Sequence, residues 1–220
     1  MLQGEYWFKN EDGTVSSVIF PAPPEKTILN SQEIIELCEK GMISPFEREK
    51  VRQLEDKRAI SFGASGFGYD LTFSKENFYI CSYGQEPLDP LKEDGNKEYF
   101  ELTEPTDYKG YKVFILPPYT FALCQSNEYI KMPADVHGIC TSKSTYVRCG
   151  LMALNSPAEA GWEGILTIEL GNITPRPVIV YPDMGILQMM FFRGNPTVAY
   201  TGKYNGQTGT TFPKVGYAST

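Results

Sequence analysis

Short runs of apolar residues, separated by turn residues, dominate the chain from Ile60 onward. Their lengths, and the Pro, Gly and Asn residues between them, are typical of β-strands joined by turns. Spacing of this kind indicates a barrel or a jelly-roll sandwich, so we predict a mainly β fold. The predicted strands cover residues 69–73, 77–82, 112–116, 120–124, 136–141, 165–170, 177–181 and 186–192.

One amphipathic helix is predicted before these strands. Asn30 can cap it, with Glu33 three residues later, and Gly41 can end it. The charged run Glu47–Arg58 is predicted to be a solvated connector, helical or irregular, and residues 84–98 a long polar loop. The apolar stripe of the helix comprises Ile34, Ile35, Leu37 and Cys38.

This pattern divides the chain into three parts. Residues 1–29 form a predicted N-terminal extension, with a hairpin around Asn10–Gly13 and a linker over Phe20–Pro24. Residues 30–200 form the β domain. Residues 201–220 form a glycine-rich C-terminal tail, which is either simply mobile or a lid that orders over a ligand.

Length and composition restrict the class of protein. A chain of 220 residues can bury one good core, and no apolar run reaches the roughly 18 residues of a membrane span. The N-terminus lacks the basic and apolar regions of a signal peptide. The five cysteines are widely spaced, without a C-x-x-C pair, which argues against a disulfide framework or a structural zinc site. We therefore expect a cytoplasmic protein without a membrane partner.

The formal net charge of −7 argues against nucleic-acid binding, which usually requires a basic face. A small polyanionic ligand remains compatible with this charge if a local basic cluster holds it. Ser142–Thr145 is one candidate, because Lys143 and two hydroxyl groups could bracket a phosphate. The segment lacks the glycines of a Walker A loop or a Rossmann turn, and an ordinary polar strand end explains it equally well.

His137 is the only histidine, and this excludes two classes of hydrolase. Zinc deaminases need a His-x-Glu element and a Pro-Cys-x-x-Cys element, and the chain has neither. A Ser-His-Asp triad would need the same histidine, and there is no Gly-x-Ser-x-Gly elbow. We therefore interpret His137 as structural.

Glu169 is an acidic residue inside the apolar run Ile165–Leu170. Strict alternation places it on one face of the strand with Ile165 and Thr167, opposite Leu166, Ile168 and Leu170. A carboxylate there is either solvated on an edge strand or held in a site that uses it. Arg148 as a partner would position a buried charge that is otherwise costly.

Four motifs follow one another along the chain: Lys-Ser-Thr-Tyr-Val-Arg-Cys-Gly, then Glu-Ala-Gly-Trp-Glu-Gly, then Thr-Ile-Glu-Leu, and finally Gly-Lys-Tyr-x-x-Gln-x-Gly. In this order they resemble the dCTP deaminase family, which shares its trimeric fold with dUTPases. The similarity extends upstream through Ser61–Asp70 and Leu116–Leu123, so it covers roughly residues 30–213.

The resemblance implies a distorted, jelly-roll-like β-barrel of the dUTPase type with a few short helices. It further implies a homotrimer with sites between subunits, and a nucleoside triphosphate bound together with Mg²⁺. The implied reaction is hydrolytic removal of the 4-amino group of dCTP, without zinc, in pyrimidine deoxynucleotide metabolism. It also makes dTTP a candidate feedback ligand.

Carried over residue by residue, the resemblance assigns roles within this site. Glu169 matches the catalytic glutamate and would shuttle protons, Ser144 matches the serine that positions water, and Arg148 matches the arginine beside them. The implied substrate contacts are Lys143 and Thr145 for the phosphates, Glu159 near the sugar, Thr167 in the pocket, and Tyr200, Lys203, Tyr204 and Gln207 in the tail.

Departures from the family pattern concern the phosphate loop and the loop near the base. Ser142 replaces a common glycine, Glu159 a common aspartate, and Ala160 a common proline. The segment Asn155–Glu159 is also about two residues shorter than in some members, which leaves a modified cytosine open as the substrate.

The nearest alternative is a dUTPase, whose strand normally has an apolar residue at the position of Glu169. Trp162 also lies near the position at which a dUTPase has a tyrosine beneath the sugar of its substrate. A bifunctional enzyme that also cleaves the triphosphate stays open, since both activities use this fold. A non-catalytic regulatory module is disfavoured, because Glu169 and Arg148 are both present.

Overall fold

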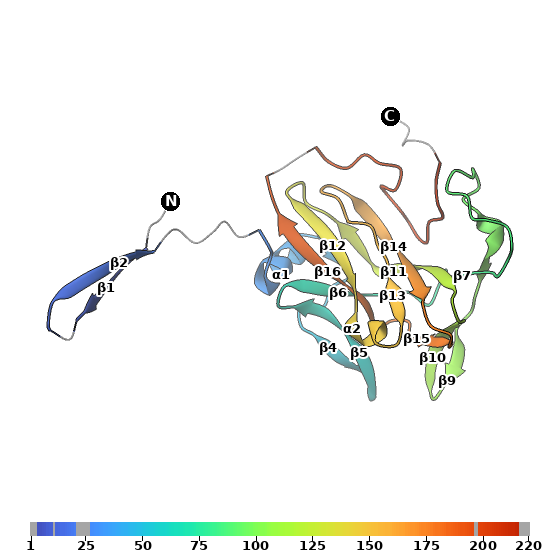
Figure 1. Ribbon diagram of the computed structural model, residues 1–220, viewed down its shortest axis with the longest axis horizontal. Coiled ribbons are helices and arrows are strands. Elements are labelled where there is room, and N and C mark those ends of the chain that lie inside the picture. The colour runs from blue at the N-terminus through green and yellow to red at the C-terminus, as the bar shows by residue number, and fades with distance from the viewer. Residues whose placement is uncertain (1–3, 11, 21–26, 196–197, 216–220) are drawn as a thin grey trace.

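The computed structural model describes residues 4–10, 12–20, 27–195 and 198–215 (Figure 1). Strands dominate these ranges, together with two α-helices and one short 3₁₀ helix, so the prediction of a mainly β fold is confirmed. None of the described helices is long and apolar enough to cross a membrane. The helices are α1 Ser31–Glu39, η1 Lys97–Tyr99 and α2 Ser144–Val147.

The strands are short and antiparallel to their neighbours. They are β1 Gly4–Lys9, β2 Val15–Phe20, β3 Ile43–Ser44, β4 Val51–Leu54, β5 Lys57–Ser65, β6 Gly68–Thr72, β7 Tyr79–Cys81, β8 Phe100–Leu102, β9 Thr106–Tyr108, β10 Tyr111–Leu116, β11 Phe121–Lys131, β12 Val136–Ser142, β13 Leu151–Ala153, β14 Glu163–Asn172, β15 Val178–Val180 and β16 Gly185–Arg193.

Two large sheets build the body of the molecule. One has the order β13-β14-β11-β7-β8, with β3 also paired to β11, and the other has the order β12-β16-β6-β5-β4. Apolar side chains from both sheets form one buried core, for example Ile168 and Leu170 of β14 with Leu187 and Met189 of β16. A smaller sheet, β15-β10-β9, lies at one end (Figure 1).

Helix α1 begins and ends as its sequence predicts. The Asn30 side chain accepts a hydrogen bond from the Glu33 backbone N–H, and the Glu33 carboxylate accepts one from the Asn30 N–H. Ile34 is buried against the core, and Gly41 follows the helix with a φ of +95°. Such a left-handed residue ends a helix at little cost when it is glycine.

The charged run Glu47–Arg58 is not a helical or irregular connector, and that prediction is wrong. Most of it belongs to a hairpin in which β4 pairs with β5, and the turn places Glu55 at a φ of +52°. Within this hairpin, β4 is the edge strand of its sheet, so its charged side chains can face water. Charge on such an edge strand hides the alternation by which a strand is recognised.

A hairpin around Asn10–Gly13 is confirmed, since β1 pairs with β2 in a two-stranded sheet of its own. The Gly13 N–H donates to the Asn10 carbonyl oxygen across the turn. Most of the predicted linker Phe20–Pro24 lies outside the described residues. Residues 84–98 are largely turns and irregular backbone, as predicted.

Glu128 is a buried carboxyl group that the sequence did not single out. Its side chain is 3% exposed and lies beside an irregularity in the pairing of β11 with β14. It accepts hydrogen bonds from the Thr72 backbone N–H at 3.1 Å and from the Thr72 hydroxyl at 3.0 Å. Burial raises the pKa of Glu128 to about 7, against an ordinary value of 4.5.

We expect Glu128→Gln to flatten the dependence of folding stability on pH. The raised pKa stabilises the native state below pH 4.5, and this contribution is lost as the pH rises to about 7. The difference in free energy of unfolding between the variant and wild type should be about 3 kcal/mol more favourable to the variant at pH 8 than near pH 4.5, since one pKa unit corresponds to about 1.4 kcal/mol. Urea unfolding at several pH values measures this gain. Glu101→Gln, at an exposed strand position, is the control, and parallel curves for Glu128→Gln and wild type would contradict the expectation.

Candidate active site

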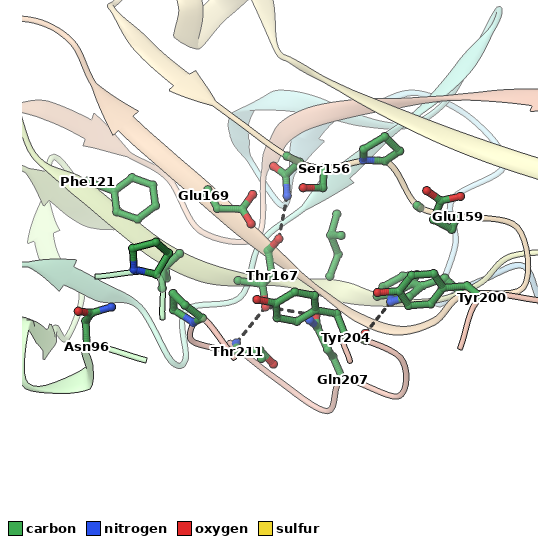
Figure 2. A pocket seen from close by; sticks show the side chains of 18 of the residues that line it. Asn96, Phe121, Ser156, Glu159, Thr167, Glu169, Tyr200, Tyr204, Gln207 and Thr211 are labelled. Atoms are coloured by element: carbon green, nitrogen blue, oxygen red, sulfur yellow. Dashed lines mark hydrogen bonds between the residues drawn. The ribbon is translucent and has the colours of Figure 1, made fainter. Parts of the chain in front are cut away.

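A cavity of about 580 Å³ opens beside β14, and we call it the Glu169 pocket (Figure 2). Its walls come from four places: strands of the large sheet, the loop between β7 and β8, the loop after β13, and the C-terminal tail. It is lined by Leu88, Pro90, Asn96, Phe100, Phe121, Leu123, Asn155, Ser156, Pro157, Ala158, Glu159, Trp162, Leu166, Thr167, Glu169, Tyr200, Tyr204, Gln207, Thr211 and Pro213.

Glu169 projects into this pocket from the face of β14 that the alternation predicted. Ile168 and Leu170 are fully buried in the core, whereas Thr167 and Glu169 point together into the cavity (Figure 2). The opposite residue on β11 is Leu123, which gives the carboxyl group an apolar neighbour. Glu169 is therefore held on a rigid strand, within the sheet rather than at its edge.

The carboxyl group of Glu169 lies in surroundings that favour its protonated form. Its Oε2 atom is buried and has no hydrogen-bond partner among the described residues. Burial raises its pKa to about 7, although its own backbone N–H partly offsets this effect. A carboxyl group with a pKa near neutrality can both accept and donate a proton at the pH of a cell.

The C-terminal tail, residues 201–215, lies along β14 of its own chain. Gly164 and Gln207 form a parallel bridge, and the Ile165 N–H donates to the Gln207 carbonyl oxygen at 2.7 Å. A Cβ atom at Gly164 would lie 2.7 Å from the Gln207 nitrogen, so only glycine admits the tail here. This arrangement favours the prediction that the tail is a lid over the alternative that it is simply mobile.

Side chains reinforce the docking of the tail over the pocket. The Trp162 indole N–H donates to the Tyr204 carbonyl oxygen at 2.7 Å. The Thr167 hydroxyl accepts from the Thr211 backbone N–H at 2.9 Å and lies 3.3 Å from Gln207 Oε1. Thr167 thus links β14, which lines the pocket, to the C-terminal tail, which lies over it.

The loop after β13 closes the pocket on another side. The Leu154 N–H donates to the Glu169 carbonyl oxygen at 2.8 Å, and Ala158 pairs with Gly138 of β12. Glu159 lies at the exposed rim, with Oε2 3.7 Å from His137 Nδ1. Figure 2 shows Glu159 and Tyr200 near one end of the pocket and Phe121 near the other, with Glu169 between them.

Residues 28–194 match the model of the family described as dCTP deaminase-like. The chain belongs to the dCTP deaminase family. The dCTP deaminase of Nautilia profundicola is 42% identical over 181 residues, which cover 80% of this chain and 90% of that protein. The dCTP deaminase of Herpetosiphon aurantiacus is 41% identical over 182 residues, covering 80% and 92% respectively.

A crystal structure of 2'-deoxycytidine 5'-triphosphate deaminase from Agrobacterium tumefaciens has the same fold. The TM-score is 0.53 at 16% identity, and the match covers 76% of this chain and 48% of that one. At this identity the likeness concerns the fold alone. Membership of the dCTP deaminase family, which the sequence motifs predicted, is confirmed by the family model and the relatives, and it identifies the chain as a hydrolase.

The structure brings only part of the site predicted for a dCTP deaminase into one pocket. Five of the predicted residues do not line the Glu169 pocket within the described chain. The residues that do line it are Glu159, Thr167, Glu169, Tyr200, Tyr204 and Gln207, and those that do not are Lys143, Ser144, Thr145, Arg148 and Lys203.

Lys143 lies in a buried ion cluster instead. Its Nζ donates to Asp70 Oδ2 at 2.6 Å, and the same oxygen lies 3.0 Å from Lys50 Nζ. Asp70 is 1% exposed and the Lys143 side chain 10%. Two ammonium groups on one carboxylate leave the cluster with a net positive charge.

Helix α2 presents the rest of the basic and hydroxyl cluster to the surface. Ser144, Thr145 and Arg148 are exposed, and Thr145 lines an open hollow together with Arg52 and Arg58. The predicted contact of Arg148 with Glu169 is not formed within this one chain. Lys203 donates to the Lys214 carbonyl oxygen and lies over the Tyr204 ring.

Asn155 is a pocket residue that the sequence did not single out. Its side-chain N–H donates to the Thr167 carbonyl oxygen at 2.7 Å, while Oδ1 is buried without a partner among the described residues. The only sequence signal was the shortened loop Asn155–Glu159, which points to the loop as a whole and not to Asn155 in particular. The contact with Thr167 joins positions twelve apart, and no local pattern reports it.

Proposed function

We propose that the chain catalyses the hydrolytic deamination of dCTP to dUTP and ammonia, with Glu169 as the proton shuttle and without zinc. The observation that supports this most directly is the Glu169 carboxyl group, buried in a pocket with one unpaired oxygen and a pKa raised to about 7. The relatives named dCTP deaminase supply the substrate in this proposal.

The proposed reaction needs one group that moves protons in both directions. The Glu169 carboxylate takes a proton from water as the water oxygen bonds to C4 of cytosine, and it passes this proton to N3. The carboxylate then takes the proton of the new C4 hydroxyl group and donates it to the 4-amino nitrogen, so the C4–N4 bond breaks and ammonia leaves as the keto group of uracil forms. A dry pocket that raises the pKa suits both steps.

In this proposal Ser144 orients the water and Arg148 stabilises the charge that develops beside Glu169. Both lie outside the Glu169 pocket of their own chain. We therefore propose a homotrimer in which α2 of a neighbouring subunit reaches the pocket and supplies these two residues. The exposure of Ser144 and Arg148 on a single chain is consistent with such an interface.

The triphosphate is proposed to bind between the tail and α2 of the neighbouring subunit. Lys203 and the Thr145 hydroxyl would contact phosphate oxygens, while Lys143 would act through the net positive charge that it shares with Lys50 and Asp70. Glu159 would lie near the sugar, and Tyr200, Tyr204 and Gln207 would cover the nucleotide.

Mg²⁺ is proposed to enter with the nucleotide, where it would neutralise phosphate charge. Among the described residues no three His, Cys, Asp or Glu side chains gather in a metal-binding group. Mg²⁺ usually keeps several waters and binds through substrate phosphates, so the proposed ion needs no cage of protein ligands. A dTTP feedback ligand would occupy the same phosphate contacts.

The proposal is tested by incubating the purified protein with dCTP, dCMP, CTP or dUTP, with Mg²⁺ and a zinc chelator. We expect ammonia and dUTP from dCTP alone, with the rate unchanged by the chelator. Chromatography of the products also detects pyrophosphate, which would reveal a second activity. Absence of ammonia from every cytosine nucleotide would contradict the proposed function.

A further inference from the structure

The orientation of the Asn155 amide is fixed by its partner. The Thr167 carbonyl oxygen can only accept a hydrogen bond, so the atom 2.7 Å from it must be the amide nitrogen of Asn155. The oxygen Oδ1 therefore points the other way. The bond to Thr167 holds the side chain in this orientation against β14.

Asn155 Oδ1 is a buried acceptor for which the described chain supplies no donor. Buried polar atoms in native proteins are nearly always hydrogen-bonded, so an unpaired one in a pocket indicates where a ligand donates. Both Asn155 and Glu169 line the Glu169 pocket, and Leu154 bonds through its backbone to Glu169. Glu169 Oε2 is also buried and unpaired, so two residues that line the pocket each have an oxygen for which the described chain supplies no donor.

Cytosine has a complementary pattern at this end. Its 4-amino group has two N–H donors, whereas uracil and thymine have an acceptor oxygen at C4. We propose that Asn155 Oδ1 accepts a hydrogen bond from the 4-amino group of the bound cytosine and selects the amino substrate over keto nucleotides. The inference rests on the proposed function, because it places C4 of the base beside Glu169.

Asn155 would then reduce the affinity for the product. Once ammonia leaves, the new C4 oxygen faces Asn155 Oδ1, and two acceptors without a hydrogen between them repel each other. A site that binds a polar group discriminates strongly against an analogue that leaves its own polar atom unpaired.

The test compares wild type with Asn155→Leu, which has a side chain of similar size without polar atoms. We expect the KM for dCTP to rise about tenfold, the effect of losing one good hydrogen bond, while the inhibition constant of dUTP stays the same or falls. A residue that only ties the loop to Thr167 would weaken both nucleotides by the same factor, and that result would overturn the inference. Leu154→Ala, exposed on the same loop, is the matched control.

A second measurement changes the ligand and needs no variant. The 2-pyrimidinone analogue of dCTP lacks the 4-amino group, and we expect wild type to bind it about tenfold more weakly than dCTP. Equal binding of the two would overturn the inference even if Asn155→Leu fails to fold. If wild type releases no ammonia from dCTP, the proposed function fails, but calorimetric titration of wild type and Asn155→Leu with dCTP, dUTP and the analogue still decides the role of Asn155.

Discussion

Glu169→Gln is expected to lower kcat for dCTP by about 10³-fold, within the range that general acid–base catalysis contributes. The amide has nearly the same shape but cannot exchange a proton at neutral pH. Binding should survive, because the change removes a carboxyl group that burial already keeps close to half protonated near pH 7. We expect the dissociation constant of dCTP to stay within about threefold, measured by calorimetry beside a rapid ammonia assay.

Glu163→Gln is the matched control for this loss. Glu163 lies on the same strand, β14, but its side chain is 39% exposed and pairs with Lys131 at 3.3 Å. It should retain wild-type turnover. Equal turnover by Glu169→Gln and wild type would rule out the proton shuttle, whereas loss of binding and turnover together would make Glu169 a binding residue.

Mixing variants tests whether neighbouring subunits share the site. Glu169→Gln and Arg148→Ala should each be inactive alone. If Glu169 of one subunit works with Arg148 of another, random co-assembly leaves about a quarter of the sites with both native residues, and activity returns. No recovery in verified mixed oligomers would place both residues in a single subunit's site.

Asp70→Ala is expected to destabilise the fold by about 3–5 kcal/mol, the usual result of removing one partner from a buried ion pair. Asp70 is 1% exposed and holds Lys143 and Lys50 at 2.6 and 3.0 Å. Without the carboxylate, the nearly buried Lys143 ammonium is left without a counter-charge. Urea unfolding at matched protein concentration measures the change, because association would also shift the midpoint.

The matched control for Asp70 is Asp107→Ala. Asp107 pairs with Lys112 at 2.9 Å, but the two side chains are 77% and 60% exposed. Such a pair contributes about 0–1 kcal/mol, so its loss should change the free energy of unfolding little. Similar effects of the two substitutions would mean that the Asp70 cluster exchanges freely with water, contrary to its burial.

The sequence predicted those parts of the fold that depend on neighbours in the chain. The cap of α1 joins residues three apart, and the alternation that places Glu169 on the pocket face of β14 repeats every two residues. The hairpin of β4 and β5 was missed because its charges obscure the pattern on an edge strand. Family motifs, not spacing, predicted which residues belong to the site.

The parts that the sequence did not predict depend on contacts between distant residues. Lys143 donates a hydrogen bond to Asp70, which is 73 positions away in the sequence. Because of this contact, Lys143 belongs to a buried ion cluster and is not a free phosphate ligand. Asn155 becomes informative only when the Thr167 carbonyl fixes its amide. Such partners are set by the arrangement of the strands, which no short window of sequence contains.

The docking of the tail on β14 also gives a direct probe of whether the pocket is open. The Ile165 amide hydrogen is bonded to the Gln207 carbonyl oxygen, and the Gly206 amide to that of Glu163. When the tail lifts, both amides lose these acceptors and exchange their hydrogens with solvent. Deuterium uptake at these two positions therefore reports the fraction of open sites in the unlabelled protein, and nucleotide binding should slow it.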